Sequence, residues 1–338
     1  MKRKGTDMNH LTRRNFVGMA SAAGAASSVL GWPVLAQAGK TSGRVVIIGG
    51  GFGGASCAKY LSRIAPGIDV TLVERDSKFI TCPFSNAVLG GLYDMGFITH
   101  GYDALQNKHG VTVIHDSATD VDAGAKKIKL AGGGELVYDR LVVSPGIDFK
   151  WGSVAGYDEA ASEMIPHAWK AGSQTMILRR QLEQMSDGGV VIIAAPKNPF
   201  RCPPGPYERA SLIAHYLQQA KPKSKILIYD AKNKFSKQPL FEQGWAALYP
   251  GMIEWIKESD GGAIEAVDAK AITVHPTFGD PQKGDVINFI PPQKAGNIAE
   301  VAGLTNADGW CTVDQRTFES RVHSDIHVIG DAAVATPM

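Results

Sequence analysis

Three glycines and one acid within residues 44–74 have the types and spacing of a dinucleotide-binding motif. Gly49, Gly51 and Gly54 form the pattern G-x-G-x-x-G, and Glu74 follows 20 residues after the last glycine. Such glycines let a turn come close to a pyrophosphate, and the acid accepts a hydrogen bond from a ribose hydroxyl. The pattern alone is weak, because glycine is common in surface loops. Its place between an apolar run and a helix-like segment favours a dinucleotide site.

A second candidate for chemistry is Cys82, which lies between a Thr and a Pro just past the second apolar run. This position should fold over the nucleotide-binding edge of a sheet, so the thiol could reach the dinucleotide, although a structural loop cysteine is the alternative. Cys57 falls on the helix after the glycines and is assigned to the core. The histidines and cysteines show no metal-ligand spacing, so metal binding is not expected.

These residues need a βαβ unit to position them. The sequence predicts a strand at 45–48, a helix at 55–64 and a second strand at 70–73. Further strands are expected at 111–115 and 127–130, with a glycine turn at 132–134 that indicates a β-meander. Two more predicted strands belong to the same domain, namely 141–143 and 326–329.

A second βαβ unit is predicted from a strand at 189–195, a helix at 210–219 and a strand at 225–229. Its connecting turn, 196–205, contains four prolines in place of the glycines. Proline lacks the N–H donor that would bind a phosphate. The second unit is therefore predicted to have the architecture of a nicotinamide nucleotide domain without its binding site. Segments 264–274 and 285–290 are expected to be strands that return to the first domain.

The length of 338 residues predicts two domains. We assign 39–150 and 284–338 to a discontinuous FAD-binding domain and 151–283 to the second, NAD-like domain. The net charge of +2 falls to −2 when the five basic residues and one acid of 1–38 are set aside. A slightly acidic protein of this kind is not expected to bind nucleic acid.

Residues 1–38 are predicted to be a twin-arginine signal peptide. Arg13 and Arg14 precede a weakly apolar run that ends in A-Q-A, which resembles a cleavage site. A chance Arg-Arg pair on a disordered tail is the alternative. Twin-arginine export carries folded proteins, which suits a protein that takes up its cofactor in the cytoplasm. We therefore expect a periplasmic location and no membrane span.

Short stretches along the chain resemble those of FAD-dependent pyridine nucleotide–disulfide reductases. The closer resemblance is to the flavoprotein (FAD-binding) subunit of flavocytochrome c sulfide dehydrogenase. The stretches that carry it are T-C-P-F-S-N at 81–86, H-G-Y-D at 100–103, H-D-S-A-T at 115–119, P-H-A-W-K-A-G at 166–172, P-F-R-C-P-P-G-P-Y-E-R-A at 199–210, I-P-P-Q at 290–293, A-G-L-T-N at 302–306, G-W-C-T-V-D at 309–314 and H-V-I-G-D-A at 327–332.

This resemblance implies an α/β fold of two Rossmann-like FAD/NAD(P)-binding domains of the disulfide-reductase type. It also implies that the sequence is truncated at its C-terminus, without an interface domain and without the helix expected after Ala335. Cys82 matches a cysteine that forms a thioether to FAD. The pair Gly330-Asp331 matches the site of the FAD ribityl chain. Lys294 is placed by analogy at the pyrimidine edge of the flavin.

For the reaction, the resemblance implies that Cys202 is one half of a redox-active disulfide. Its partner is expected beyond Met338, because Cys311 does not match it. The implied enzyme is a periplasmic sulfide dehydrogenase. It oxidises hydrosulfide to sulfur or polysulfide through a cysteine persulfide and FAD, and passes electrons to a c-type cytochrome subunit carrying haem c. The alternatives are a sulfide:quinone oxidoreductase-like enzyme and a non-catalytic flavoprotein partner of a sulfur-oxidation complex.

Overall fold

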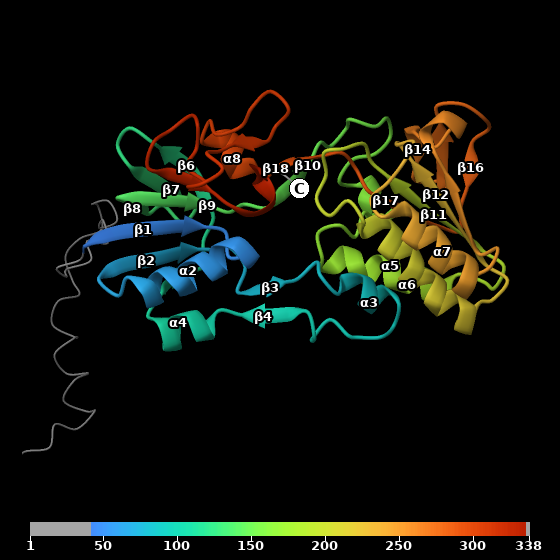
Figure 1. Ribbon diagram of the computed structural model, residues 1–338, viewed down its shortest axis with the longest axis horizontal. Helices are drawn as coiled ribbons and strands as arrows, with labels where there is room; N and C mark the ends of the chain where they lie inside the picture. Colours follow the sequence, from blue (N-terminus) through green and yellow to red (C-terminus); the bar gives the residue numbers. More distant parts are fainter. Residues whose placement is uncertain (1–41, 336–338) are drawn as a thin grey trace, which may run out of the picture.

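A computed structural model describes residues 42–335 and shows two α/β domains lying side by side (Figure 1). The predicted signal peptide at 1–38 and the helix expected after Ala335 lie outside the described residues. In both domains a parallel sheet carries helices, as expected for βαβ units whose strands are buried on both faces.

The first domain is built on a five-stranded parallel sheet in the order β20-β9-β1-β2-β5. Its strands consist of β-branched and other apolar residues that form a buried core. Their bounds are β1 Gly43–Ile48, β2 Ile68–Val73, β5 Thr112–Ile114, β9 Arg140–Val143 and β20 Ile326–Val328.

Helices α2 (Phe52–Ile64) and α4 (Asp103–His109) lie on one side of this sheet, and an antiparallel meander lies on the other (Figure 1). The predicted meander is confirmed, with its third strand formed after the glycine turn. Smaller elements complete the domain: β6 Ala118–Asp122, β7 Lys127–Leu130, β8 Glu135–Val137, α8 Asn297–Val301, β19 Cys311–Thr312, η3 Gly330–Ala332 and β21 Ala333–Val334.

The second domain has a four-stranded parallel sheet in the order β13-β12-β11-β17, with a three-stranded antiparallel sheet, β14-β15-β16, beside it. The strands are β11 Val190–Ala195, β12 Lys225–Asp230, β13 Ile253–Ile256, β14 Ile264–Asp268, β15 Thr273–Pro276, β16 Gln282–Lys283 and β17 Val286–Phe289. The helices are α5 Ser173–Gln184, α6 Gly205–Ala220 and α7 Gln238–Leu248, with short 3-10 turns η1 Ala161–Glu163 and η2 Glu258–Asp260.

Two predicted strand assignments are wrong. The segment 285–290 was expected to return to the first domain, but β17 pairs with β11 in the sheet of the second domain. The segment 264–274 likewise stays in the second domain as β14 and β15. All four residues of β17 are buried, so the sequence pattern of this strand fits either sheet equally well. The chain therefore returns to the first domain after Phe289 and not at 284.

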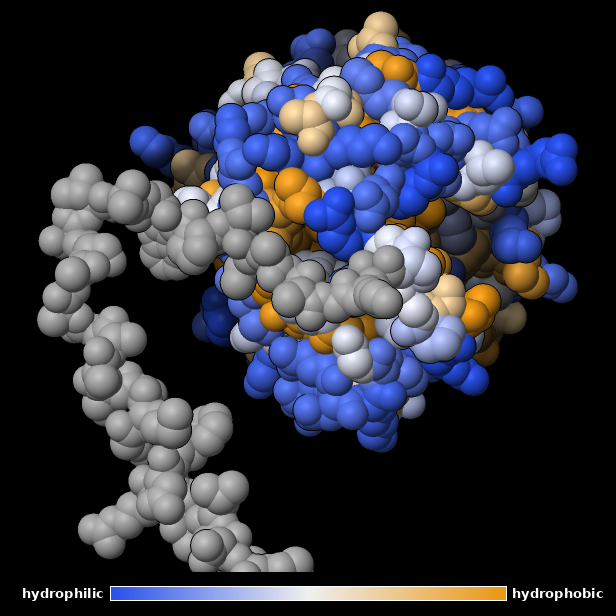
Figure 2. All heavy atoms as spheres, turned by 90° about the vertical axis from the view of Figure 1, so that its left-hand side faces the viewer, coloured by the Kyte–Doolittle hydropathy of each residue, from blue (hydrophilic) through white to orange (hydrophobic). Residues whose placement is uncertain are grey.

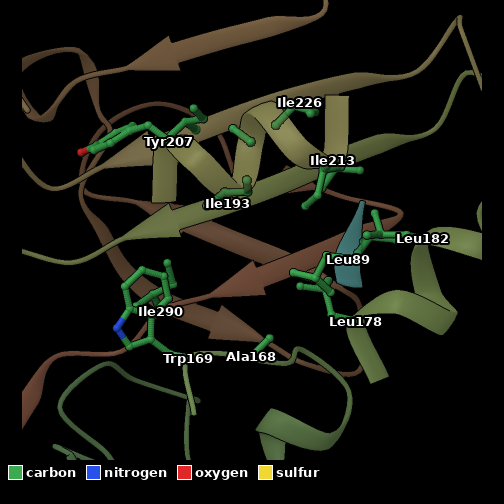
Figure 3. Close-up of a cluster of buried hydrophobic side chains, with 14 of the residues drawn as sticks. Leu89, Ala168, Trp169, Leu178, Leu182, Ile193, Tyr207, Ile213, Ile226 and Ile290 are labelled. Atoms are coloured by element: carbon green, nitrogen blue, oxygen red, sulfur yellow. The ribbon is translucent and has the colours of Figure 1, made fainter. Parts of the chain in front are cut away.

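Three segments join the domains. The ribbon of β3 (Lys78–Ile80) and β4 (Thr99–Gly101) leaves the first domain and carries the short helix α3 (Ser85–Leu89), which packs against α5 and α6. In Figure 3, Leu89 of α3 lies among the core side chains of the second domain. Strand β10 (Ile147–Phe149) pairs antiparallel with β18 (Gln293–Ala295) where the chain passes between the domains.

The outer face of the first domain is mostly hydrophilic, as expected for a surface in contact with water (Figure 2). Among the described residues, no helix combines the length and the apolar character needed to cross a membrane.

Candidate functional site

The predicted dinucleotide residues gather at one edge of the first sheet. Gly49 follows β1, Ser144 follows β9 and Gly330 follows β20. The three strands are parallel, so their carboxyl ends lie on the same edge. Chain order reverses between β1 and β9, and a dinucleotide binds at such a switch point in open α/β sheets.

The glycine turn after β1 has no space for a side chain at Gly49 or Gly54. Gly49 has a φ of +96°, and a Cβ there would lie 2.2 Å from the carbonyl oxygen of Ser144. A Cβ on Gly54 would lie 1.8 Å from the carbonyl oxygen of Gly49, so the start of α2 packs directly on the turn. Gly51 precedes α2 without a capping side chain, which leaves the first N–H groups of a 13-residue helix free for an anion. These features fit the pyrophosphate of a dinucleotide.

Glu74 holds this turn in place. Its Oε2 accepts from the N–H of Gly50 at 2.6 Å, and its Oε1 accepts from the N–H of Asp76 at 3.0 Å. The hydroxyl of Tyr102 donates to the carbonyl of Gly50, and burial raises the pKa of Tyr102, with Glu74 adding to the effect. A carboxylate can accept further bonds, so the ribose contact predicted for Glu74 stays a prediction.

Asp331 connects the dinucleotide edge with the second domain. It follows Gly330, whose φ is +76°, in the turn η3. Its Oδ2 lies 3.6 Å from Nη1 of Arg201, the residue before Cys202. The carboxylate predicted to meet the FAD ribityl chain thus lies beside the loop of the predicted redox cysteine.

Cys82 and Cys202 come from different domains, and both lie near Trp169. The Sγ of Cys82 donates to the carbonyl oxygen of Trp169 at 3.3 Å. Gly205 lies between the indole of Trp169 and the other cysteine, because a Cβ there would be 2.6 Å from the ring and 3.2 Å from the Sγ of Cys202. The structure therefore brings the two predicted cysteines to one place.

Cys202 is in a strained turn and faces solvent. Its φ is +59°, a value that is uncommon outside glycine, and the residue is exposed. Partial burial of the sulfur raises the pKa of the Cys202 thiol. The negative charge of Glu208 raises this pKa further, and the positive charge of Arg201 lowers it. Strained backbone at an exposed thiol is typical of functional loops.

Two arginines from the second domain organise this region. Arg209 is buried, and its guanidinium donates to side chains or carbonyls at four positions, Asn86, His167, Ala168 and Asn288. Arg201 donates to the carbonyl of Trp169 through its side chain, and its backbone N–H donates to Oε1 of Gln293 at 2.9 Å. Both arginines therefore hold the segments around the cysteines together.

Two buried donors in the same region have no partner within the described residues, Nε1 of Trp169 and Nε2 of Gln293. Buried N–H groups are rarely left without an acceptor. Figure 3 shows the indole nitrogen of Trp169 on the side of the ring away from the aliphatic core. Donors of this kind fit a cofactor with ring carbonyls and ring nitrogens, as FAD has. Lys294 pairs with Glu300, so its predicted role at the flavin stays a prediction.

In the second domain, the position that binds a ribose in related folds is occupied by the protein itself. Asp230, at the end of β12, is fully buried. Its carboxylate accepts from Tyr207 at 2.5 Å, from Trp255 at 2.9 Å and from Lys232 at 2.6 Å. The ring of Phe235 stacks on Tyr207. This arrangement supports the prediction that the domain takes no pyridine nucleotide.

The other two cysteines lie away from this place. Cys57 is on α2 and packs against the core of the first domain. Cys311 is fully buried in β19 within another core cluster of that domain, and burial raises its pKa to about 11. No group of three His, Cys, Asp or Glu side chains within 42–335 is arranged to hold a metal ion.

Sequence reasoning did not assign roles to Trp169, Arg201, Arg209 or Gln293. Trp169 and both arginines lie in stretches that carry the family resemblance, and Gln293 ends a third such stretch. Those stretches were therefore a signal that the residues matter. Nothing in the sequence indicated that they meet around the two cysteines.

The fold and the site define a two-domain oxidoreductase of the disulfide-reductase type. A family model for pyridine nucleotide–disulphide oxidoreductases matches residues 43–173, and one for the central part of the sulfide dehydrogenase [flavocytochrome c] flavoprotein chain matches residues 175–291. Over 45 residues, 13% of this chain, it is 69% identical to the sulfide dehydrogenase [flavocytochrome c] flavoprotein chain of Chlorobaculum thiosulfatiphilum, covering 94% of that sequence. The chain belongs to this flavoprotein family.

More distant relatives show the same fold over most of the chain. The mitochondrial sulfide:quinone oxidoreductase of Dictyostelium discoideum is 23% identical over 86% of this chain, which spans 65% of that relative's length. The structure of the Aquifex aeolicus sulfide:quinone oxidoreductase matches with a TM-score of 0.70 at 20% identity, covering 86% of this chain and 68% of that one. An NAD-dependent persulfide reductase from A. fulgidus matches with a TM-score of 0.67 at 17% identity, over 86% and 53% of the two chains.

These findings confirm the predicted family and the predicted fold class. They also identify the chain as a flavoprotein with FAD as its cofactor, in agreement with the geometry of the glycine turn.

Proposed function

We propose that this protein is the flavoprotein of a sulfide dehydrogenase, which oxidises hydrosulfide and passes the electrons to a c-type cytochrome. The observation that carries the proposal is the meeting of Cys82 and Cys202 at Trp169, beside the carboxyl edge of the first sheet. One thiol is available to fasten a cofactor, and the other is exposed for a substrate. Family membership supports both assignments.

FAD would be held by the glycine turn at 49–54, by the free N-terminus of α2 and by Asp331, with Cys82 as the point of covalent attachment. When bound, FAD accepts two electrons and can release them one at a time, which suits a haem acceptor. A covalent link would prevent loss of the cofactor outside the cytoplasm. Such a link would suit a protein that is exported through the twin-arginine pattern at Arg13 and Arg14, and we propose a periplasmic location.

In this proposal Cys202 accepts the sulfur atom of hydrosulfide. Hydrosulfide attacks a disulfide that includes Cys202, so one S–S bond breaks, a new S–S bond forms as a persulfide, and one thiolate is released. The persulfide holds its outer sulfur ready for transfer as sulfur or polysulfide. Arg201 and Arg209 supply positive charge where an anionic substrate must approach. Exposure of Cys202 gives the substrate access.

The proposal is tested by anaerobic mixing of the purified protein with hydrosulfide, followed by absorbance of the flavin. We expect the wild type to lose its oxidised flavin absorbance and then to reduce added cytochrome c. Cys202→Ser should remain oxidised while keeping its flavin. Cys57→Ser is the matched control and should behave as the wild type. Equal reduction of Cys202→Ser and the wild type would rule out the role of this thiol.

A sulfide:quinone oxidoreductase-like enzyme is the second candidate, because relatives with that name cover 86% and 85% of this chain. It would share the thiol chemistry but deliver its electrons to a quinone. Offering a soluble quinone and cytochrome c to the sulfide-reduced protein separates the two. Faster reoxidation by the quinone would favour the second candidate. If hydrosulfide leaves the flavin oxidised altogether, a non-catalytic flavoprotein partner of a sulfur-oxidation complex is favoured.

A further inference from the structure

Arg209 is the most deeply buried cation of the region around the two cysteines. It lies in the second turn of α6 and is only 2% exposed. Its Nε donates to Oδ1 of Asn86 at 3.0 Å, and its Nη2 donates to the carbonyl of Ala168 at 2.7 Å. Its Nη1 donates to the carbonyl of His167 at 3.0 Å and to Oδ1 of Asn288 at 2.8 Å. The guanidinium thus connects α6 with three other segments of the chain.

All four acceptors are neutral. A buried charge is costly unless it is paired with an opposite charge, and buried arginines usually meet a carboxylate. Among the described residues no carboxylate lies within ion-pair distance of Arg209. The hydrogen bonds use four of the five N–H donors of the guanidinium but leave its charge without a counterion. This arrangement is unusual for a residue that serves packing alone.

Trp169 lies between this charge and the surroundings of both thiols. The guanidinium stacks over the indole of Trp169, with 4.9 Å between the Cζ atom and the ring centre. Trp169 is the residue whose carbonyl accepts from Cys82 and whose ring lies beside Gly205 and Cys202. Asn86, one of the four acceptors, lies in helix α3, which begins three residues after Cys82. One guanidinium therefore contacts the helix that follows Cys82 and the indole that lies near Cys202.

We infer that Arg209 is a positioning residue with two roles: it holds the Cys82 loop on the second domain, and its unneutralised charge stabilises the thiolate form of Cys202. The first role follows from the bond to Asn86. The second follows from the position of a cation without a counterion on the indole of Trp169, which Gly205 separates from a thiol that must be deprotonated to react. The inference rests on the proposed function only where it gives the Cys202 thiolate a role in sulfide oxidation.

Other charged groups face Cys202, and they act in both directions. Glu208, on α6, disfavours the thiolate. Arg201 favours it, although Asp331 of η3 lies 3.6 Å from that arginine and partly neutralises it. Burial lowers the pKa of Arg209 to about 10, and the nearby Cys82 and Cys202 counteract this lowering. Arg209 therefore stays charged at neutral pH. Of the two arginines, Arg201 has Asp331 beside it, whereas Arg209 has no acid within ion-pair distance among the described residues.

The experiment measures the rate of alkylation of Cys202 against pH. The full-length protein is reduced, exposed to short pulses of iodoacetamide, and digested, so that mass spectrometry follows each cysteine separately. The midpoint of the Cys202 profile reports the pKa of its thiol. Cys57 serves as an internal reference, because it lies on α2 in the first domain.

The most informative variant is Asn86→Asp. It keeps the shape of the side chain and the oxygen that accepts from Nε, and it places a carboxylate next to the guanidinium. We expect the Cys202 midpoint to rise by about one pH unit, as for removal of a nearby opposite charge. Arg209→Met should raise it similarly, whereas Arg209→Lys, which keeps a charge, should retain most of the wild-type value.

Arg179→Met is the matched control. Arg179 also holds α3, since its Nη1 donates to the carbonyl of Leu89 at 2.7 Å, but within 42–335 its hydrogen bonds and ion pairs involve neither Trp169 nor the residues next to the two cysteines. It should leave the midpoint unchanged. If Asn86→Asp folds with the wild-type midpoint, or if Arg209→Lys shifts as far as Arg209→Met, the charge has no role and the inference is wrong. Both outcomes are independent of sulfide oxidation.

Discussion

Single residues set the geometry of the dinucleotide edge, and Gly54 shows this most clearly. It lies on α2, where the helix touches the turn after β1, and a Cβ there would lie 1.8 Å from the carbonyl oxygen of Gly49. Backbone on both sides leaves neither partner free to move. The role predicted for this glycine, close packing of helix and strand, is therefore the one that the structure gives it.

Gly54→Ala should lower the free energy of unfolding by about 1–3 kcal/mol, because the added methyl group overpacks a rigid contact. Urea unfolding followed by circular dichroism would measure it. Gly244→Ala is the control: it lies within α7 with no atom within 4 Å of the added Cβ. That variant should be slightly more stable than the wild type. Equal destabilisation of both would contradict the packing argument.

His167 gives a prediction on pH at the same scale. It is buried, its Nδ1 accepts from the N–H of Trp169, and burial lowers its pKa to about 3, with Lys170, Arg209 and Arg201 adding to the effect. The folded state therefore keeps this ring neutral, while the unfolded state protonates below pH 6.5. Its contribution to stability is complete above pH 6.5 and is lost as the pH falls toward 3.

The wild type should accordingly lose up to about 1.4 kcal/mol per pH unit between pH 6 and pH 4 through this group. His167→Asn keeps an acceptor but does not titrate, so its stability should fall less steeply over the same range. Urea unfolding at each pH measures both slopes. His100→Asn, at an exposed position, should keep the wild-type slope. Parallel curves for the wild type and His167→Asn would show that the ring is not held neutral.

Among the elements, the short helix α3 has the largest effect on the site. It belongs by sequence to the first domain, yet Leu89 is fully buried in the core of the second, among Leu178, Leu182 and Ile213 (Figure 3). A five-residue helix has little stability of its own. Its position, and with it the position of Cys82, therefore depends on packing against α5 and α6.

Leu89→Ala should lower the free energy of unfolding by about 2–5 kcal/mol through the cavity it leaves. It should also make the segment around Cys82 more sensitive to limited proteolysis. Leu92→Ala, only three residues further and 53% exposed, is the matched control and should change stability by less than about 0.5 kcal/mol. Similar losses in both variants would mean that α3 is not held by its buried face.

The βαβ unit of the second domain gives another prediction. Asp230 already accepts from Tyr207, Trp255 and Lys232, and prolines replace the glycines of the turn before α6. We expect millimolar NADH or NADPH to leave both the melting temperature and the flavin spectrum unchanged. A rise in melting temperature would indicate binding, and bleaching of the flavin would indicate electron transfer; either result would contradict this account.

At the scale of the whole molecule, the sequence was a good guide to what is local. The glycine turn, both βαβ units and the meander follow from periodicity and spacing, and they are where they were expected. Helix α6 begins at Gly205, earlier than the predicted 210, because the proline at its second position fits a helix start. The assignment of β17 failed, since a short strand that is buried on both faces does not indicate which of two sheets it joins.

The candidate site depends on contacts between distant segments, which local pattern does not reveal. Asn86, Trp169 and Arg209 come from three separate stretches and meet only where α3 packs on the second domain. Arg209 is a particular example, because an arginine in a predicted helix is normally assigned to the solvent-exposed face. Its role could be recognised only from its four neutral acceptors.

The central claim is that the two domains meet around FAD, with Cys82 as its covalent anchor. Precipitation of the purified protein with acid, followed by fluorescence of the washed pellet, tests this directly. Flavin should stay with the polypeptide in the wild type and in Cys202→Ser and should be released in Cys82→Ala. Flavin recovered free in the supernatant of the wild type would contradict it.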